Sequence, residues 1–146
     1  EVMKSLKHEF DLLRRCEHPN IIQLYGVVIE EPMCLLLEYA SRGNLRDVLD
    51  DDSQALKSMG TTQVVDCTHA QNQLLAGTAA GMSYLHGLNP CILHQDLKTS
   101  NILVFLEGRS GTPDVVPKLS DFGLSAGPCV KLVEALSSTR SMTGIC

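Results

Sequence analysis

Apolar residues at the start of the chain recur at the spacing of a helix. They are Val2, Leu6, Phe10 and Leu13. Because residues at this spacing share one side of a helix, the pattern predicts an amphipathic helix over roughly the first sixteen residues. His18 and Pro19 then end it, since the residue before a proline is disfavoured in the helical region.

Two apolar, β-rich runs follow, over 21–29 and 33–39, and the polar segment 30–32 joins them. Short apolar runs separated by a tight polar connection are typical of an antiparallel hairpin. We expect these two strands to belong to a larger sheet.

A short helix is predicted after the hairpin. Asn44, with Asp47 three residues later, resembles a capping pair, and the helix would continue through Leu49. Residues 50–63 are polar, and the acidic run at their start is expected to belong to a solvated loop.

A second amphipathic helix is predicted over 66–87, ended by a glycine that precedes an Asn-Pro pair. Its apolar side would carry Leu75, Ala79, Met82 and Leu85. Short strands are expected over 102–105 and 117–120, with a surface hairpin loop at 108–113 between them.

The composition is that of an ordinary soluble domain, with 146 residues, 44 % hydrophobic residues and a net charge of -5. The negative charge disfavours nucleic acid and anionic membranes as partners. No apolar run approaches the ~18 residues of a membrane span, and the first residues do not resemble a signal peptide. We therefore expect an intracellular protein, cytosolic or nuclear, with the cytoplasm as its location.

The six cysteines are scattered, without a C-x-x-C pair. This spacing disfavours a zinc site and a disulfide framework, so all six are expected to be free thiols.

A run of polar residues lies between the second helix and the last strands: HQDLKTSN over 94–101, followed by DFG over 121–123. The pattern brings together two carboxylates, a lysine and an amide, which phosphoryl transfer uses for positioning and charge neutralisation. Taken singly, each residue would more often be a surface charge or a turn residue. Their combination predicts a phosphoryl-transfer centre.

The chain resembles protein kinases of the tyrosine-kinase-like group, and among them the mixed-lineage serine/threonine kinases. The segments that carry the resemblance are HPNII (18–22), LLEYA (36–40), GMSYLH (81–86) and LKTSNIL (97–103). An insertion before D-F-G, here 107–116, is also typical of that group. The resemblance implies a partial, α+β, protein-kinase-like fold, in which 1–40 form the remainder of the small lobe and the hinge and 41–146 the first part of the large lobe.

The resemblance also implies a role for each residue of the polar run. Asp96 corresponds to the catalytic aspartate that orients the substrate hydroxyl, and Lys98 to the cation beside the γ-phosphate. Asn101 and Asp121 correspond to ligands of Mg²⁺, which prefers oxygen donors. The expected cofactors are thus ATP and Mg²⁺, and the expected partner is a protein substrate with a Ser or Thr hydroxyl, while the oligomeric state stays open.

A nucleotide site is implied near the end of the first hairpin. Leu37 corresponds to the gatekeeper, and adenine would bond to the carbonyl of Glu38 and the amide of Ala40. The other implied members are Leu103 under the adenine ring, Asn44 and Asp47 toward the ribose, and Glu9, which pairs with an ATP-binding lysine in the family. A stacked column is implied for Leu13, Leu24, His94 and Phe122.

Two features depart from the kinase pattern. Gln95 replaces an arginine that pairs with a phosphorylated activation segment in many kinases, so phosphorylation of the hydroxyl-rich stretch 137–143 is expected to change activity little. The chain contains no G-x-G-x-x-G loop, no V-A-I-K lysine and no A-P-E.

Three functions remain open at this point. The first is an ATP-dependent serine/threonine kinase, favoured because Lys98 and Thr99 follow Leu97 where tyrosine kinases usually carry another pattern. The second is a pseudokinase or regulatory interaction module, and the third is a truncated fragment without independent function. The 146-residue chain by itself is expected to show no kinase activity.

Overall fold

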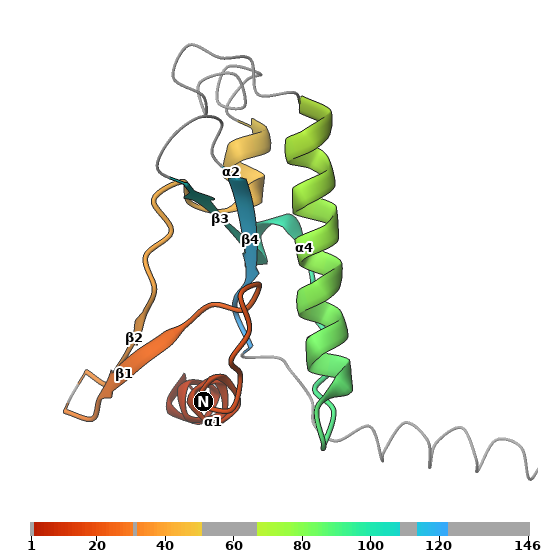
Figure 1. Ribbon diagram of the computed structural model, residues 1–146. Coiled ribbons are helices and arrows are strands. Elements are labelled where there is room, and N and C mark those ends of the chain that lie inside the picture. The colour runs from red at the N-terminus through yellow and green to blue at the C-terminus, as the bar shows by residue number, and fades with distance from the viewer. Residues whose placement is uncertain (1, 31, 51–66, 109–113, 123–146) are drawn as a thin grey trace, which may run out of the picture.

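The computed structural model describes residues 2–30, 32–50, 67–108 and 114–122 (Figure 1). Its elements are α1 (Val2–Leu13), β1 (Leu24–Val28), β2 (Cys34–Leu37), α2 (Leu45–Asp50), α4 (Cys67–Gly87), the 3-10 helix η1 (Thr99–Asn101), β3 (Ile102–Glu107) and β4 (Asp114–Leu119). The strands form two separate antiparallel pairs, β1–β2 and β3–β4. Helices combined with antiparallel hairpins confirm the predicted α+β class.

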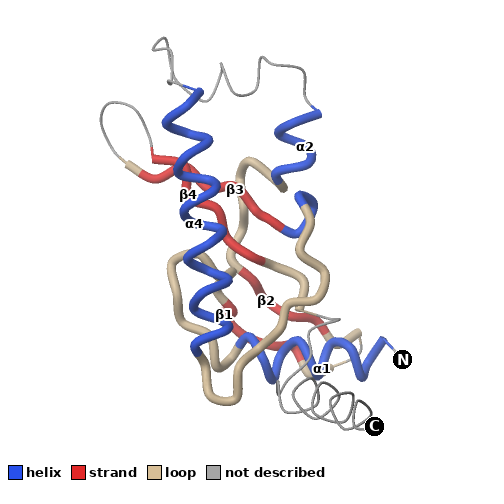
Figure 2. The backbone as a smooth tube through the Cα atoms, turned by 90° about the vertical axis from the view of Figure 1, so that its right-hand side faces the viewer, coloured by secondary structure: helices blue, strands red, loops and turns tan. Residues whose placement is uncertain are grey.

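The arrangement has the β3–β4 hairpin in its middle. Helix α4 runs along β4, α2 lies toward one end, and α1 with the β1–β2 hairpin lies toward the other (Figures 1 and 2). The main core forms where these parts meet, and its fully buried side chains include Leu13, Ile22, Leu85, Leu119 and Phe122.

Helix α1 is shorter than predicted. It ends at Leu13, because the amides of Arg15 and Cys16 donate to carbonyls three residues back, both at 3.0 Å, which tightens the last turn. Of the predicted apolar side, Leu13 is buried in the core, and Leu6 and Phe10 are partly buried. Leu12, which the pattern did not include, is buried as well.

The hairpin prediction is confirmed, but the apolar run 21–29 divides between two partners. Only Leu24–Val28 pairs with β2, with Val27 opposite Leu35. The preceding residues bind β4 instead: the Ile22 amide donates to the Leu119 carbonyl at 2.9 Å, and the Leu119 amide to the Asn20 carbonyl at 2.9 Å. An apolar run does not reveal which strand it will pair with.

Helix α4 matches its predicted bounds to within one residue, yet its buried side is shifted. Leu75 is 71 % exposed, whereas Ala70, Leu74 and Leu85 are buried. The surface against β4 includes Gly81, whose lack of a side chain lets the strand approach closely. The apolar pattern underestimated the role of small residues.

Helix α2 begins with the predicted capping pair. Asn44 Oδ1 accepts the backbone N–H of Asp47 at 2.9 Å, and Asn44 Nδ2 donates to Asp47 Oδ2 at 2.7 Å. The helix extends to Asp50, one residue beyond the prediction.

Strands β3 and β4 pair from Ile102 opposite Leu119 to Glu107 opposite Asp114. Both are six residues long, longer than predicted, since Glu107 and residues 114–116 of the insertion belong to the strands. Most of the predicted loop at 108–113 lies outside the described residues.

The cysteine prediction is confirmed for Cys16 and Cys34, which are free, and wrong for Cys91, which is disulfide-bonded. Pairing depends on the distance between residues in the fold, which spacing along the chain does not show. Within the described residues, no helix is both long and apolar enough to cross a membrane.

Candidate active site

The polar run between α4 and β3 folds into a compact cluster. Lys98 Nζ donates to Asp96 Oδ2 at 2.6 Å, and Asn101 Nδ2 donates to the same oxygen at 3.0 Å and to the Asp96 carbonyl at 2.9 Å. Helix η1 positions Asn101 for these bonds, because the backbone N–H of Asn101 donates to the Lys98 carbonyl at 2.9 Å. Three of the four predicted catalytic residues are therefore in direct contact.

Asp121 follows the end of β4 and is held near this cluster. The Ser120 amide and hydroxyl both donate to the Asn101 carbonyl, at 2.9 and 3.1 Å. Asp121 and Gln95 have φ values of 62°, in the left-handed region. Non-glycine residues adopt this region rarely and mostly at functional or tightly constrained positions.

The charges of the cluster affect one another. The hydrogen bond from Lys98 lowers the pKa of Asp96, with a further contribution from the Asn101 amide. The same hydrogen bond raises the pKa of Lys98, and the Asp96 and Asp121 charges add to this effect. Asp96 is thus a stable carboxylate acceptor and Lys98 a stable cation at neutral pH.

Glu9 extends from α1 to the segment that carries Asp121 and Phe122. Its Oε1 accepts the Phe122 amide at 3.4 Å. Burial raises the pKa of Glu9, the Phe122 amide opposes this, and the nearby Asp121 carboxylate raises it further. Glu9 therefore lies beside the segment that carries Asp121. The lysine with which the family pairs it is absent from this sequence.

Two of the four side chains implied for the stacked column, His94 and Phe122, are in direct ring contact. His94 and Phe122 have ring centroids 5.0 Å apart, and His94 Nε2 is hydrogen-bonded to the Ser120 carbonyl at 3.0 Å. Leu13 belongs to the same buried core, with Leu24 packed against it. This packing fixes Phe122 in the core and, with it, the neighbouring Asp121.

The predicted nucleotide residues lie along the segment from β2 to α2. Backbone hydrogen bonds use the Glu38 amide, which donates to Gln23, and the Ala40 carbonyl, which accepts from Gly43. The resemblance assigned the other two groups, the Glu38 carbonyl and the Ala40 amide, to adenine. Leu37 is half-buried against the core.

The predicted ribose and adenine residues also meet. Asn44 and Leu103 form an isolated antiparallel bridge, and the Val104 amide donates to the Gly43 carbonyl at 2.9 Å. Asp47 is bonded to Asn44, as described above. The start of α2 is thereby fixed against β3 beside Leu103.

The donor set fits Mg²⁺ in its chemistry. Because the Asn101 amide nitrogen is held by Asp96, its oxygen is the atom left for a metal, and Asp121 offers an anionic oxygen. Among the described residues, no group of three or more His, Cys, Asp or Glu side chains is placed to hold a metal. Mg²⁺ commonly completes its coordination with phosphate oxygens and water, so two protein ligands suffice.

Lys118 was missed by the sequence analysis. This β4 residue is only 9 % exposed and forms an ion pair with Glu38. One signal could have indicated it: a lysine within a strand expected to be buried needs a partner. Gly123 and the hydroxyl-rich stretch 137–143 lie outside the described residues.

The chain belongs to the protein kinase family. The model of the protein tyrosine and serine/threonine kinase family matches residues 1–138. The fold described above is thus protein-kinase-like, as the resemblance implied.

The chain is also similar in sequence to individual protein kinases. The chain is 36 % identical over 127 residues to a probable serine/threonine-protein kinase, drkD, and 32 % identical over 145 residues to the dual specificity protein kinase splA, both from Dictyostelium discoideum. These alignments cover 86 % and 93 % of this chain but 8 % and 6 % of the relatives. The chain therefore spans less than a tenth of the length of these two curated relatives.

Proposed function

We propose that the full-length protein containing this chain transfers the γ-phosphoryl group of ATP to a Ser or Thr hydroxyl of a protein substrate. The observation that carries the proposal is the contact of Asp96 with Lys98 and Asn101, beside the segment that bears Asp121. Phosphoryl transfer passes through a loose transition state, so positioned charges supply most of the catalysis.

Each side chain has a task in this proposal. Asp96, ionised at neutral pH, accepts a hydrogen bond from the substrate hydroxyl and orients its oxygen toward the phosphorus. Lys98 places a positive charge beside the transferred group. Asn101 and Asp121 would hold Mg²⁺, which neutralises phosphate charge when bound.

The proposal extends to the nucleotide and to the lobes. Adenine binds along Glu38 and Ala40, with Leu37 behind it, and residues 1–40 and 41–146 belong to the small and large lobes. We also place the protein in the mixed-lineage group and, because it uses ATP, inside the cell.

A pseudokinase function is the second candidate. Gln95 favours it, because a glutamine cannot make the charge-assisted bidentate contact of an arginine with a phosphorylated segment. The intact cluster around Asp96 favours the enzyme. The two candidates differ in whether the protein transfers phosphate.

The deciding experiment measures transfer of labelled phosphate from Mg-ATP to a protein substrate by the full-length protein. We expect Asp96→Asn and Asp121→Asn each to reduce kcat by about 10³-fold or more, since each removes a charge used in the transition state. Arg46→Ala, which breaks only an exposed ion pair with Asp50, serves as the control. Equal turnover by wild type and both variants would contradict the enzyme proposal.

A further inference from the structure

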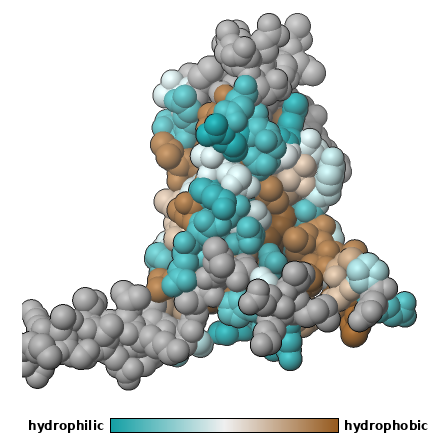
Figure 3. All heavy atoms as spheres, turned by 180° about the vertical axis from the view of Figure 1, so that it is seen from behind, coloured by the Kyte–Doolittle hydropathy of each residue, from teal (hydrophilic) through white to brown (hydrophobic). Residues whose placement is uncertain are grey.

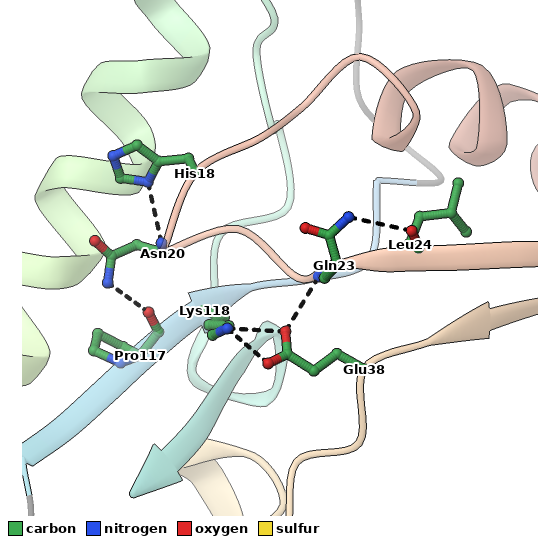
Figure 4. A network of polar contacts seen from close by, with 7 residues as sticks. All are labelled: His18, Asn20, Gln23, Leu24, Glu38, Pro117 and Lys118. Atoms are coloured by element: carbon green, nitrogen blue, oxygen red, sulfur yellow. Dashed lines mark hydrogen bonds and ion pairs between the residues drawn. The ribbon is translucent and has the colours of Figure 1, made fainter. Parts of the chain in front are cut away.

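A buried ion pair joins two segments that lie 80 residues apart in the sequence. Lys118 Nζ donates to both carboxylate oxygens of Glu38, at 2.7 and 2.9 Å, and the two side chains point toward each other (Figure 4). Their side chains are only 11 % and 19 % exposed. Each other ion pair in the described part of the chain has at least one side chain more than half exposed.

Both charges of this pair have additional partners. Glu38 Oε2 also accepts the Gln23 amide at 3.4 Å, and the Lys118 ammonium lies 4.8 Å from the centroid of the Phe105 ring. Such compensation is needed because transferring two charges from water into the protein is costly. Removing one member would leave the other charge buried without its main partner.

The two members lie at informative positions. Glu38 directly follows Leu37, the last residue of β2, in the backbone segment expected to bond adenine. Lys118 lies in β4, three residues before Asp121. The pair therefore connects the expected adenine-binding backbone to the strand that leads to the expected Mg²⁺ ligand.

We propose that Lys118 and Glu38 act as a positioning pair for the nucleotide, a role that rests on the proposed function. The side-chain contact holds the Glu38 backbone at a fixed place relative to β4. The distance between the adenine-binding backbone groups and Asp121 is thereby fixed before ATP binds. In this role, the side chains of Lys118 and Glu38 do not touch the transferred phosphate.

The expected consequence concerns binding more than chemistry. A site that is already ordered loses less conformational entropy when the ligand binds, so its affinity is higher. Without the ion pair, the Glu38 segment would have to be ordered by the nucleotide itself. ATP binding should then weaken, while turnover of bound ATP, which depends on the Asp96 cluster, should change little.

The test compares Lys118→Met with Lys118→Arg in the full-length protein. Methionine keeps a long stem over Phe105 but removes the charge. Arginine keeps a bidentate cation, and a cavity of about 230 Å³ bordered by Lys118, His18 and Gln23 offers room for it. Arg46→Met is the matched control, because it removes the cation of the exposed pair with Asp50.

We expect Lys118→Met to raise KM for ATP and the Kd of Mg-ATP by about 5- to 10-fold with kcat within about 2-fold, as lost preorganisation predicts. Lys118→Arg and Arg46→Met should bind as wild type does. If Lys118→Met does not fold, Glu38→Gln replaces it, and weaker binding by that variant supports the proposal.

Two results would overturn the positioning role alone: unchanged nucleotide affinity in Lys118→Met, or a changed kcat with unchanged KM. Failure of the wild-type protein to bind Mg-ATP would instead overturn the proposed function, and this inference with it. Melting temperatures of all variants separate a loss of affinity from a loss of folded protein.

Discussion

Two carboxylates near the proposed site, Asp96 and Glu9, have environments that shift their pKa values in opposite directions. The Lys98 hydrogen bond lowers the pKa of Asp96, whereas burial raises the pKa of Glu9. Pairs of titratable groups whose pKa values are shifted apart are typical of catalytic centres. Asp96 is therefore suited to accept a hydrogen bond, and Glu9 is the group whose charge is costly to the fold.

This difference leads to a prediction for Glu9→Gln. A raised pKa means that the folded chain takes up this proton more readily than the unfolded chain, so ionised Glu9 costs stability above that pKa and the cost disappears as the pH falls. Glutamine can still accept the Phe122 amide. We expect a higher melting temperature at pH 7, by roughly 1–2 °C for a chain of this size.

The pH dependence provides the check. The advantage of Glu9→Gln over wild type should diminish as the pH is lowered toward the ordinary glutamate pKa, about 4.3. Glu107→Gln, at an exposed position at the end of β3, is the control and should change little. A lower melting temperature for Glu9→Gln at pH 7 would show that the carboxylate stabilises the fold.

At the level of single residues, the sequence predicted contacts between residues of one short motif. Asp96, Lys98 and Asn101 are close in sequence and came together as expected. The Lys118 contact with Glu38 was not predicted, because it depends on which strand side faces the β2 end. A local pattern does not contain that information.

Among the elements, α4 depends on close packing at Gly81. A Cβ atom at Gly81 would lie 2.8 Å from the Asn20 carbonyl oxygen and 3.1 Å from Leu119 Cδ1. The Asn20 carbonyl cannot shift freely, because it accepts the Leu119 amide. At Gly87, in contrast, no neighbouring atom lies within 4 Å of the added Cβ.

We therefore predict that two alanine substitutions in the same helix differ in their effect on stability. Gly81→Ala should destabilise the chain by roughly 1–3 kcal/mol through overpacking, although alanine is the better helix former. Gly87→Ala should leave the free energy of unfolding unchanged to within about 0.5 kcal/mol. Urea unfolding of the two variants measures both, and equal stabilities would refute the packing argument.

Element bounds were predicted best where a local signal ends the element. The Asn44 cap and the glycine at the end of α4 fixed their helices to within one residue. The β3–β4 strands were predicted too short, since the pairing of 107 with 114 depends on two segments meeting. The division of the run 21–29 was missed for the same reason.

Across the whole molecule, the two hairpins differ in burial. Val104 in β3 and Leu119 in β4 are fully buried, whereas Tyr25 in β1 is 70 % exposed and Leu36 in β2 is 51 % exposed. Seen from behind, apolar atoms lie at the surface toward the end of the molecule that carries β1–β2 (Figure 3). Fewer buried contacts make local opening less costly.

Amide hydrogen exchange should therefore divide the molecule into two parts. We expect amides of β1–β2 to exchange at least about 10-fold faster than those of β3–β4, since lower local stability permits more frequent opening. Peptide-resolved mass spectrometry of the deuterated chain measures this. Equal protection of Val27 and Val104 would contradict the prediction.

The direction of the β3–β4 hairpin has a consequence for variation in chain length among relatives. The Ile102–Leu119 end of the hairpin adjoins Asn101 and Asp121, and the Glu107–Asp114 end is the opposite one. Residues added between Glu107 and Asp114 leave the pairing at the Asp121 end unchanged. A single residue added between Asn20 and Ile22 would displace one of the two backbone bonds to Leu119. Natural differences in chain length should therefore accumulate between Glu107 and Asp114. They should be excluded between Asn20 and Ile22.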